Sequence, residues 1–183
     1  MSLRTKYQIF FILIFNAIST ISWAANTQKP VLQPALKTVS EQWLRGNGAV
    51  RGGVSESYMS LYDIRKSASQ KLKTERLILD WGDAIGRPAT KGGYYQVEYQ
   101  EKSHRLIINM ALTLNSKIEG KVLTDRLSKG LYIKQAQLEF DRISQSQNLV
   151  LDLKKSVRVR VASYPSHMQE PKFPARLVVD LVE

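Results

Sequence analysis

Four six-residue segments along the chain share one pattern of hydrophobic and polar positions. Position one is Arg or Asn, positions two to four are aliphatic, position five is Asp or Asn, and position six is large and apolar. The segments, called the hexapeptides below, span residues 76–81, 105–110, 148–153 and 176–181. Because the side chains of a strand alternate between its two faces, positions two, four and six share one face. The pattern therefore predicts four strands that are each buried on one side.

Shorter stretches of alternation predict partner strands before or after the hexapeptides. Residues 94–100 place Tyr95, Val97 and Tyr99 on one face, and residues 135–140 alternate in the same way. Residues 157–161 place three valines on one face and Arg158 and Arg160 on the other. With polar turns between them, these segments predict sequential antiparallel neighbours.

One stretch between the strand-rich halves has helical spacing instead. Within residues 112–129, apolar side chains recur at Ile118, Val122, Leu123 and Leu127, with charged residues between them. This spacing predicts one short helix, which we expect to end with Gly130 as its C-cap.

The strand pattern of the first half recurs in the second half. The offset is 69 to 72 residues, measured from Ile64 to Ile133, from Leu79 to Leu151 and from Ile108 to Val179. Half a sandwich cannot bury its apolar face alone, so the two copies are expected to fold together. The sequence predicts an all-β fold with one short helix. It is a β-sandwich of two small sheets with an internal pseudo-twofold repeat, its halves spanning about 58–113 and 131–183.

The N-terminal residues have the layout of a secretory signal peptide. Arg4 and Lys6 precede an apolar run over residues 9–21, and Ser22-Trp23-Ala24 places small residues at the −3 and −1 positions. We expect export to the periplasm and cleavage after Ala24 rather than a retained anchor, because the run is short for a bilayer span. Residues 25–57, rich in Pro and Gly, are expected to form a flexible leader. In it, Trp43 is either a plug on the domain surface or a partner contact.

Charge and residue usage narrow the classes of function. The formal net charge of +11 favours anionic partners of the envelope, namely cell wall, lipid headgroups or acidic proteins, although it also serves solubility alone. An exported chain rarely meets nucleic acid, so we expect no nucleic-acid partner. The chain has no cysteine and only two histidines, His104 and His167, and it lacks a G-x-S-x-G motif. We therefore expect no enzyme, no catalytic or metal site and no cofactor.

Two groups of residues are candidate ligand contacts. Tyr94 lies beside a glycine-rich loop that carries Arg87 and Lys91, and aromatic rings near cations suit sugars and amide-bearing peptides. The alternative is that the aromatics of this region belong to the core. Arg158 and Arg160, close to two lysines, could contact anionic groups, or they could be a solvated outer face.

The Arg and Asp of each hexapeptide share the outer face of their strand. In antiparallel neighbours the Arg of one copy can lie opposite the Asp of another, and we expect Arg176 to pair with Asp152 and Arg76 with Asn109. Such pairs fix strand register. The alternative is that this face forms a polar ligand surface.

A family resemblance follows from these strands. The segment RLILDW at residues 76–81, a loop, an alternating strand and the terminal segment PARLVVDL at residues 174–181 resemble the AMIN (amidase N-terminal) domain over about residues 58–183. The resemblance implies a symmetric sandwich of two small sheets that binds peptidoglycan in the periplasm and localises a partner. The alternative function is an interaction subunit of an envelope machine, such as a type IV pilus or secretion apparatus, that uses sheet-edge contacts.

Overall fold

The computed structural model describes residues 40–55, 59–111, 113–116, 118, 120–144, 146–166 and 173–183. The described strands are β1 (Ser40–Leu44), β2 (Gly48–Gly52), β3 (Met59–Ser69), β4 (Thr74–Gly82), β5 (Tyr95–Gln100), β6 (Arg105–Met110), β7 (Thr113–Ser116), β8 (Ile133–Asp141), β9 (Ser146–Leu153), β10 (Arg158–Tyr164) and β11 (Arg176–Val182), and the described helix is α2 (Gly120–Leu127).

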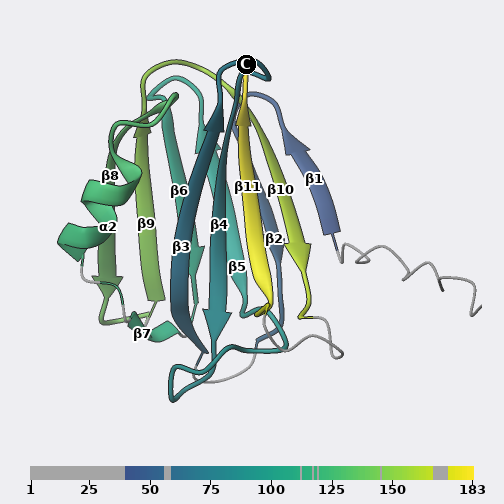
Figure 1. Ribbon diagram of the computed structural model, residues 1–183, viewed down its shortest axis with the longest axis vertical. Helices are drawn as coiled ribbons and strands as arrows, with labels where there is room; N and C mark the ends of the chain where they lie inside the picture. Colours follow the sequence, from purple (N-terminus) through teal and green to yellow (C-terminus); the bar gives the residue numbers. More distant parts are fainter. Residues whose placement is uncertain are drawn as a thin grey trace, which may run out of the picture. The chain divides into compact units, whose positions relative to one another are not determined.

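These strands form two sheets with one core between them (Figure 1). Over the described residues, one sheet has six strands in the order β1-β10-β11-β4-β3-β7, and the other has five in the order β2-β5-β6-β9-β8. Neighbours are antiparallel except for β3 and β7, which are parallel. The predicted all-β sandwich with one short helix is confirmed.

The hexapeptides lie in interior strands of both sheets: β4 and β11 are the central pair of the six-stranded sheet, and β6 and β9 are the central strand and its neighbour in the five-stranded sheet. Their second, fourth and sixth residues point into the core, and in β4 these are Leu77, Leu79 and Trp81, each at most 1% exposed. The period-two alternation therefore predicted the buried face correctly.

Sheet topology confirms the internal repeat. Exchanging β3, β4, β5 and β6 with β8, β9, β10 and β11 converts the central order of the six-stranded sheet into that of the five-stranded sheet. The register is also copied, because Ile78 lies opposite Val178 and Ile107 lies opposite Val150. The halves interlock, since each sheet takes one hairpin from each half.

The prediction that residues 25–57 form a flexible leader is wrong for the part of that segment that the structure describes. Residues 40–44 and 48–52 form the edge strands β1 and β2, which pair with β10 and β5. The glycines there serve close packing: a Cβ at Gly53, whose φ is +81°, would lie 2.0 Å from the carbonyl oxygen of Gly93. Within the described residues the sandwich thus extends back to Ser40, and its start is not residue 58. The predicted signal peptide over 1–24 and residues 25–39 and 56–57 of the predicted leader lie outside the described residues.

Helix α2 confirms the predicted helix but not its cap. Leu123 and Leu127 are buried as the stripe predicts. The left-handed residue after the helix is Lys129, with φ 64°, and not Gly130. Gly130 is needed for another reason, because a Cβ there would lie 1.9 Å from the buried carboxylate of Glu75. Among the described residues, no helix has the length and hydrophobicity needed to cross a membrane.

Candidate binding surface

The outer face of the six-stranded sheet carries paired arginines and aspartates. The register places Arg76 opposite Asp180 and Arg176 opposite Asp80, because β4 pairs with β11. The expected pairing of Arg176 with Asp152 is therefore wrong. Asp152 lies opposite Arg105 in the other sheet, 3.0 Å from its Nε. Arg does lie opposite Asp in neighbouring strands, as predicted. Which strands are neighbours could not be predicted, because the hexapeptides are nearly identical.

The other expected pair, Arg76 with Asn109, is wrong for the same reason. Asn109 lies opposite Asn148, and its Nδ2 donates to Asn148 Oδ1 at 2.6 Å. These two residues lie with Gln96, Glu98 and Ile107 around a shallow hollow of about 330 Å³ on the five-stranded sheet. That face therefore carries the amide pair of Asn109 with Asn148 as well as the ion pair of Arg105 with Asp152.

Asp180 is the most buried charged residue of the outer face, with 1% of its surface exposed. Arg76 donates from Nε to Oδ1 at 2.6 Å, and Arg160 donates from Nε to Oδ2 at 2.9 Å. Burial by itself raises the pKa of Asp180, but the hydrogen bonds from the two guanidinium groups outweigh it and hold the pKa below its ordinary value. Asp180 is thus held as a carboxylate that orients both arginines.

Asp80 occupies the equivalent position on β4, but its pKa is shifted in the opposite direction. Arg65 donates two hydrogen bonds to its carboxylate, both at 2.9 Å. Burial outweighs this contact and, with the nearby carboxylate of Asp63, raises the pKa of Asp80 above its ordinary value.

Trp43 on β1 completes an aromatic and cationic groove on the same face. Its ring is 46% exposed and lies 5.9 Å from the guanidinium carbon of Arg158 and 5.8 Å from that of Arg160. The groove measures about 550 Å³, and its lining includes Trp43, Leu72, Arg76, Arg160, Asp180 and Val182. We call it the Trp43 groove. Trp43 is half-exposed and packs against Arg158 and Arg160 on the surface of the sheet.

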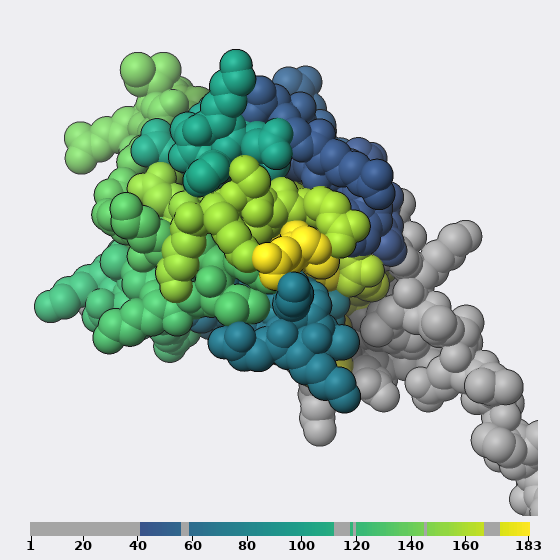
Figure 2. Space-filling model, turned by 90° about the horizontal axis from the view of Figure 1, so that it is seen from above, coloured from purple at the N-terminus to yellow at the C-terminus, as the bar shows by residue number. Residues whose placement is uncertain are grey.

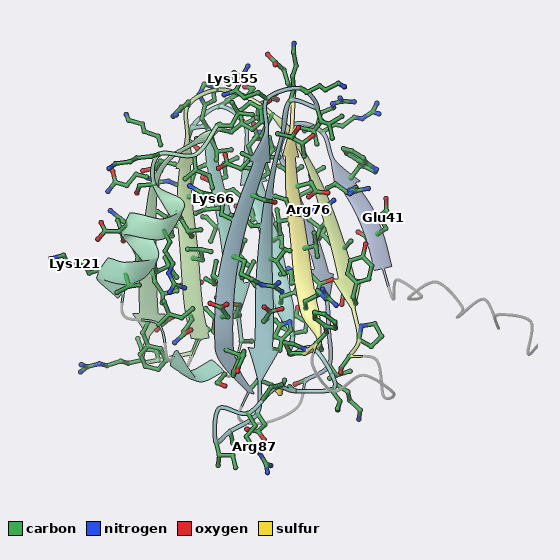
Figure 3. All side chains as sticks on the ribbon, in the orientation of Figure 1. Glu41, Lys66, Arg76, Arg87, Lys121 and Lys155 are labelled. Carbon is green, nitrogen blue, oxygen red and sulfur yellow. The ribbon has the colours of Figure 1, made fainter. Side chains whose placement is uncertain are left out.

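The structure divides the predicted ligand residues between two places. Arg158 and Arg160 lie beside the Trp43 groove, as the outward phase of their strand predicted. Arg87 and Lys91 lie in the β4–β5 loop at the opposite end of the sandwich, where Figure 3 labels Arg87. Tyr94 follows in that loop and is half-buried.

The β4–β5 loop has an internal ion pair of its own. Arg87 Nε donates to Asp83 Oδ2 at 2.9 Å, and Asp83 Oδ1 also accepts from the backbone of Arg87 and Ile85. Arg87 and Lys91 line a hollow of about 470 Å³, but Tyr94 is not part of that lining. The other aromatics of the region, Tyr95 and Tyr99, are buried core residues.

His104, the histidine within the described residues, does not line the Trp43 groove. His104 is in the β5–β6 turn with φ 50°, where its backbone oxygen accepts from Leu153. His167 lies outside the described residues.

Sequence reasoning named Trp43 as a surface plug or a partner contact but missed the strand and the groove that position it, because the residues around it were taken as a leader. The sequence offered one short clue to the orientation of Trp43. Its neighbour Leu44 is apolar and buried, and adjacent residues of a strand face opposite sides, so Trp43 must face outward if the segment is a strand. The hydrogen bonds that make it a strand come from β10, more than a hundred residues later in the chain.

The chain matches no model of a known protein family, and no curated protein matches it. The resemblance to AMIN domains stays a prediction from the residue pattern.

Proposed function

We propose that this chain is a non-catalytic, exported binding module that holds cell-wall glycan or peptide in the Trp43 groove and so localises a partner protein. The observation that carries the proposal is an exposed indole ring stacked on two guanidinium groups, beside an ion pair that fixes a third. An indole face suits the apolar face of a sugar ring, and guanidinium groups suit the carboxylates of cell-wall peptides.

The groove has the size and polarity for such a ligand. Its volume of about 550 Å³ lies within the usual range for binding sites of small molecules. The side chains of Arg76 and Arg160 retain 43% and 30% exposure after binding Asp180, although Arg160 Nη1 also lies 3.5 Å from Glu41 Oε1. Leu72 and Val182 add apolar lining.

Sedimentation with purified peptidoglycan sacculi tests the proposal. We expect the chain to pellet with sacculi at moderate salt, because stacking and hydrogen bonding survive screening better than general charge attraction does. Trp43→Ala should weaken this binding roughly three- to tenfold through loss of stacking. Phe140→Ala is the matched control, since Phe140 is an aromatic of similar exposure, 47%, on the other sheet, and this variant should pellet like the unaltered chain.

Two results would count against the groove. One is equal pelleting of Trp43→Ala and the unaltered chain, and the other is binding that disappears once salt screens the charges. Joint replacement of Arg87, Lys91 and Tyr94 is the comparison for the loop at the opposite end. If only that triple variant loses binding, the ligand site belongs to the β4–β5 loop.

The second candidate function is an interaction subunit of an envelope machine that pairs through a sheet edge. It is favoured by β8, a nine-residue edge strand followed by a turn in which Ile143 is 98% exposed. Helix α2 covers part of this edge, where the Thr124 hydroxyl donates to the carbonyl oxygen of Ala136. Absence of sacculus binding at every salt concentration would favour this function over the first.

A further inference from the structure

One end of the sandwich gathers positive charge from six segments of the chain. We call it the basic end, and its exposed cations are Arg45, Lys71, Lys73, Lys102, Lys129, Lys154, Lys155 and Arg158. Figure 2 looks onto this end: the C-terminal residues, in yellow, lie between the β3–β4 turn, in blue, and the β9–β10 turn, in lime. Figure 3 labels Lys155 there, at the end opposite Arg87.

Hydrogen bonds between the turns hold these cations on one surface. Leu153 donates from its backbone to His104, Lys154 to Tyr132, and Glu183 to Lys73. The hydroxyl of Tyr132 donates to the carbonyl oxygen of Lys73 at 2.9 Å, which ties the β3–β4 turn to the start of β8. The basic end is therefore a fixed surface of the fold and not a set of independent loops.

Few carboxylates offset this charge. In the described turns of the basic end the exposed ones are Glu101 and Glu183. Glu183 already contacts Lys73 and Lys155. Most of the positive charge is therefore left for a partner that carries many negative charges over a broad area.

Leu72 indicates which anionic partner fits. It lies in the β3–β4 turn with 70% of its surface exposed, between Lys71 and Lys73. An apolar side chain flanked by cations is suited to a lipid interface, where the leucine enters the acyl boundary and the ammonium groups stay among the headgroups. A soluble anionic polymer would leave this leucine in water.

From these observations we propose that the basic end docks on an anionic phospholipid surface, with Leu72 at the interface. The anionic headgroups attract the cations, and each lysine near such a surface strengthens binding. Docking by this end points the strands away from the lipid and leaves the outer face of the six-stranded sheet open along its length. This proposal does not rest on cell-wall binding, although Leu72 also lines one end of the Trp43 groove.

Vesicle sedimentation tests the charge requirement. We expect the chain to pellet with phosphatidylglycerol vesicles at low salt and not with phosphatidylcholine vesicles. Lys71→Glu with Lys102→Glu should weaken this binding roughly tenfold or more, because both lysines lie at the basic end. The control is Lys121→Glu with Arg142→Glu, which changes net charge equally but lies on α2 and in the β8–β9 turn. Equal weakening in both double variants would overturn the proposal, as would pelleting with neither vesicle.

A single introduced cysteine tests the orientation. The chain contains no cysteine, so Leu72→Cys and Ile143→Cys can each carry one environment-sensitive fluorophore. Ile143 lies in the turn at the opposite end and is 98% exposed. On phosphatidylglycerol vesicles we expect a blue shift for the label at 72 and none for the label at 143. A shift at 143 alone, or at neither position while the chain pellets, would overturn docking by the basic end. So would a shift at 72 that soluble polyphosphate reproduces without vesicles.

Discussion

Asp80 and Asp180 occupy the same position of the hexapeptide on neighbouring strands, yet their surroundings act on them in opposite directions. Asp180 accepts hydrogen bonds from two arginines, Arg76 and Arg160, and these lower its pKa despite burial. Asp80 has hydrogen bonds from one arginine, and burial raises its pKa. The number of guanidinium donors therefore decides which carboxylate the fold stabilises as an anion.

We predict that Asp180→Asn lowers the free energy of unfolding by about 1–3 kcal/mol at neutral pH, because it removes two charge-assisted contacts from a buried carboxylate. Asp80→Asn is the matched comparison and should cost less than about 1 kcal/mol, since half-exposed Arg65 can turn to water. Urea unfolding at neutral pH measures both. An equal loss in the two variants would contradict this assignment.

The two carboxylates should also differ in their dependence on pH. The pKa of Asp180 is lowered in the folded chain. Its contribution to the free energy of unfolding is therefore complete at neutral pH and is lost as the pH falls through the lowered pKa. Asp80 affects stability in the opposite direction. Because its pKa is raised in the folded chain, its charged form lowers the free energy of unfolding at neutral pH, and this loss is relieved as the pH falls through the raised pKa. Acid unfolding of Asp180→Asn should therefore show a shallower loss of stability than that of the unaltered chain.

At the scale of elements, the connection between α2 and β8 is anchored by a charge inside the fold. Glu75 is 0% exposed, and its Oε2 accepts from the backbone of Tyr132 at 2.6 Å and of Ile133 at 3.1 Å. Lys66 donates to the carbonyl oxygens of Leu127 and Ser128 at the end of the helix. These contacts join the first half of the chain to the start of the second.

Substitution of two glycines tests this anchor. Gly130→Ala should lower the free energy of unfolding by about 2–4 kcal/mol, because the added methyl group must displace the buried carboxylate of Glu75. Gly120→Ala meets nothing within 4 Å and lies in α2, so it should raise stability by up to about 1 kcal/mol. Thermal unfolding of both variants provides the comparison. A Gly130→Ala chain as stable as the unaltered one would show that Glu75 is not held there.

Strands and helices whose own residues show a hydrophobic periodicity could be predicted from the sequence. Strands that depend on hydrogen bonds from distant parts of the chain could not. The four hexapeptides and α2 bury a face that alternates or repeats within a few residues. β1 and β2 are five-residue edge strands whose hydrogen bonds come from β10 and β5, so their own residues gave too short a local signal to predict them. The Trp43 groove depends on β1 and was missed with it, whereas the outward phase of Arg158 and Arg160 was predicted.

At the scale of the whole molecule, the internal repeat could be predicted from the sequence, but the pairing of the strands could not. The hexapeptides share one hydrophobic pattern and differ at the polar positions of the outer face only by Asn109 and Asn148, so the pattern alone allowed any of them to pair with any other. The interlocking of the halves selects β4 with β11 and β6 with β9, and so decides which arginine meets which aspartate. The outer faces differ as a result. Pairing of β6 with β9 places Asn109 opposite Asn148, on the same face as the ion pair of Arg105, whereas Trp43 and the ion pairs of Asp180 lie on the six-stranded sheet.

The most direct test of the cell-wall proposal is a two-dimensional NMR titration of the labelled chain with soluble peptidoglycan fragments. We predict shifts of the indole N–H of Trp43 and of the side-chain Nε–H of Arg76 and Arg160. The indole N–H of Trp81, 1% exposed in the core, should stay in place. Shifts confined to the β4–β5 loop or to the amide face of the five-stranded sheet, with Trp43 unmoved, would contradict the account.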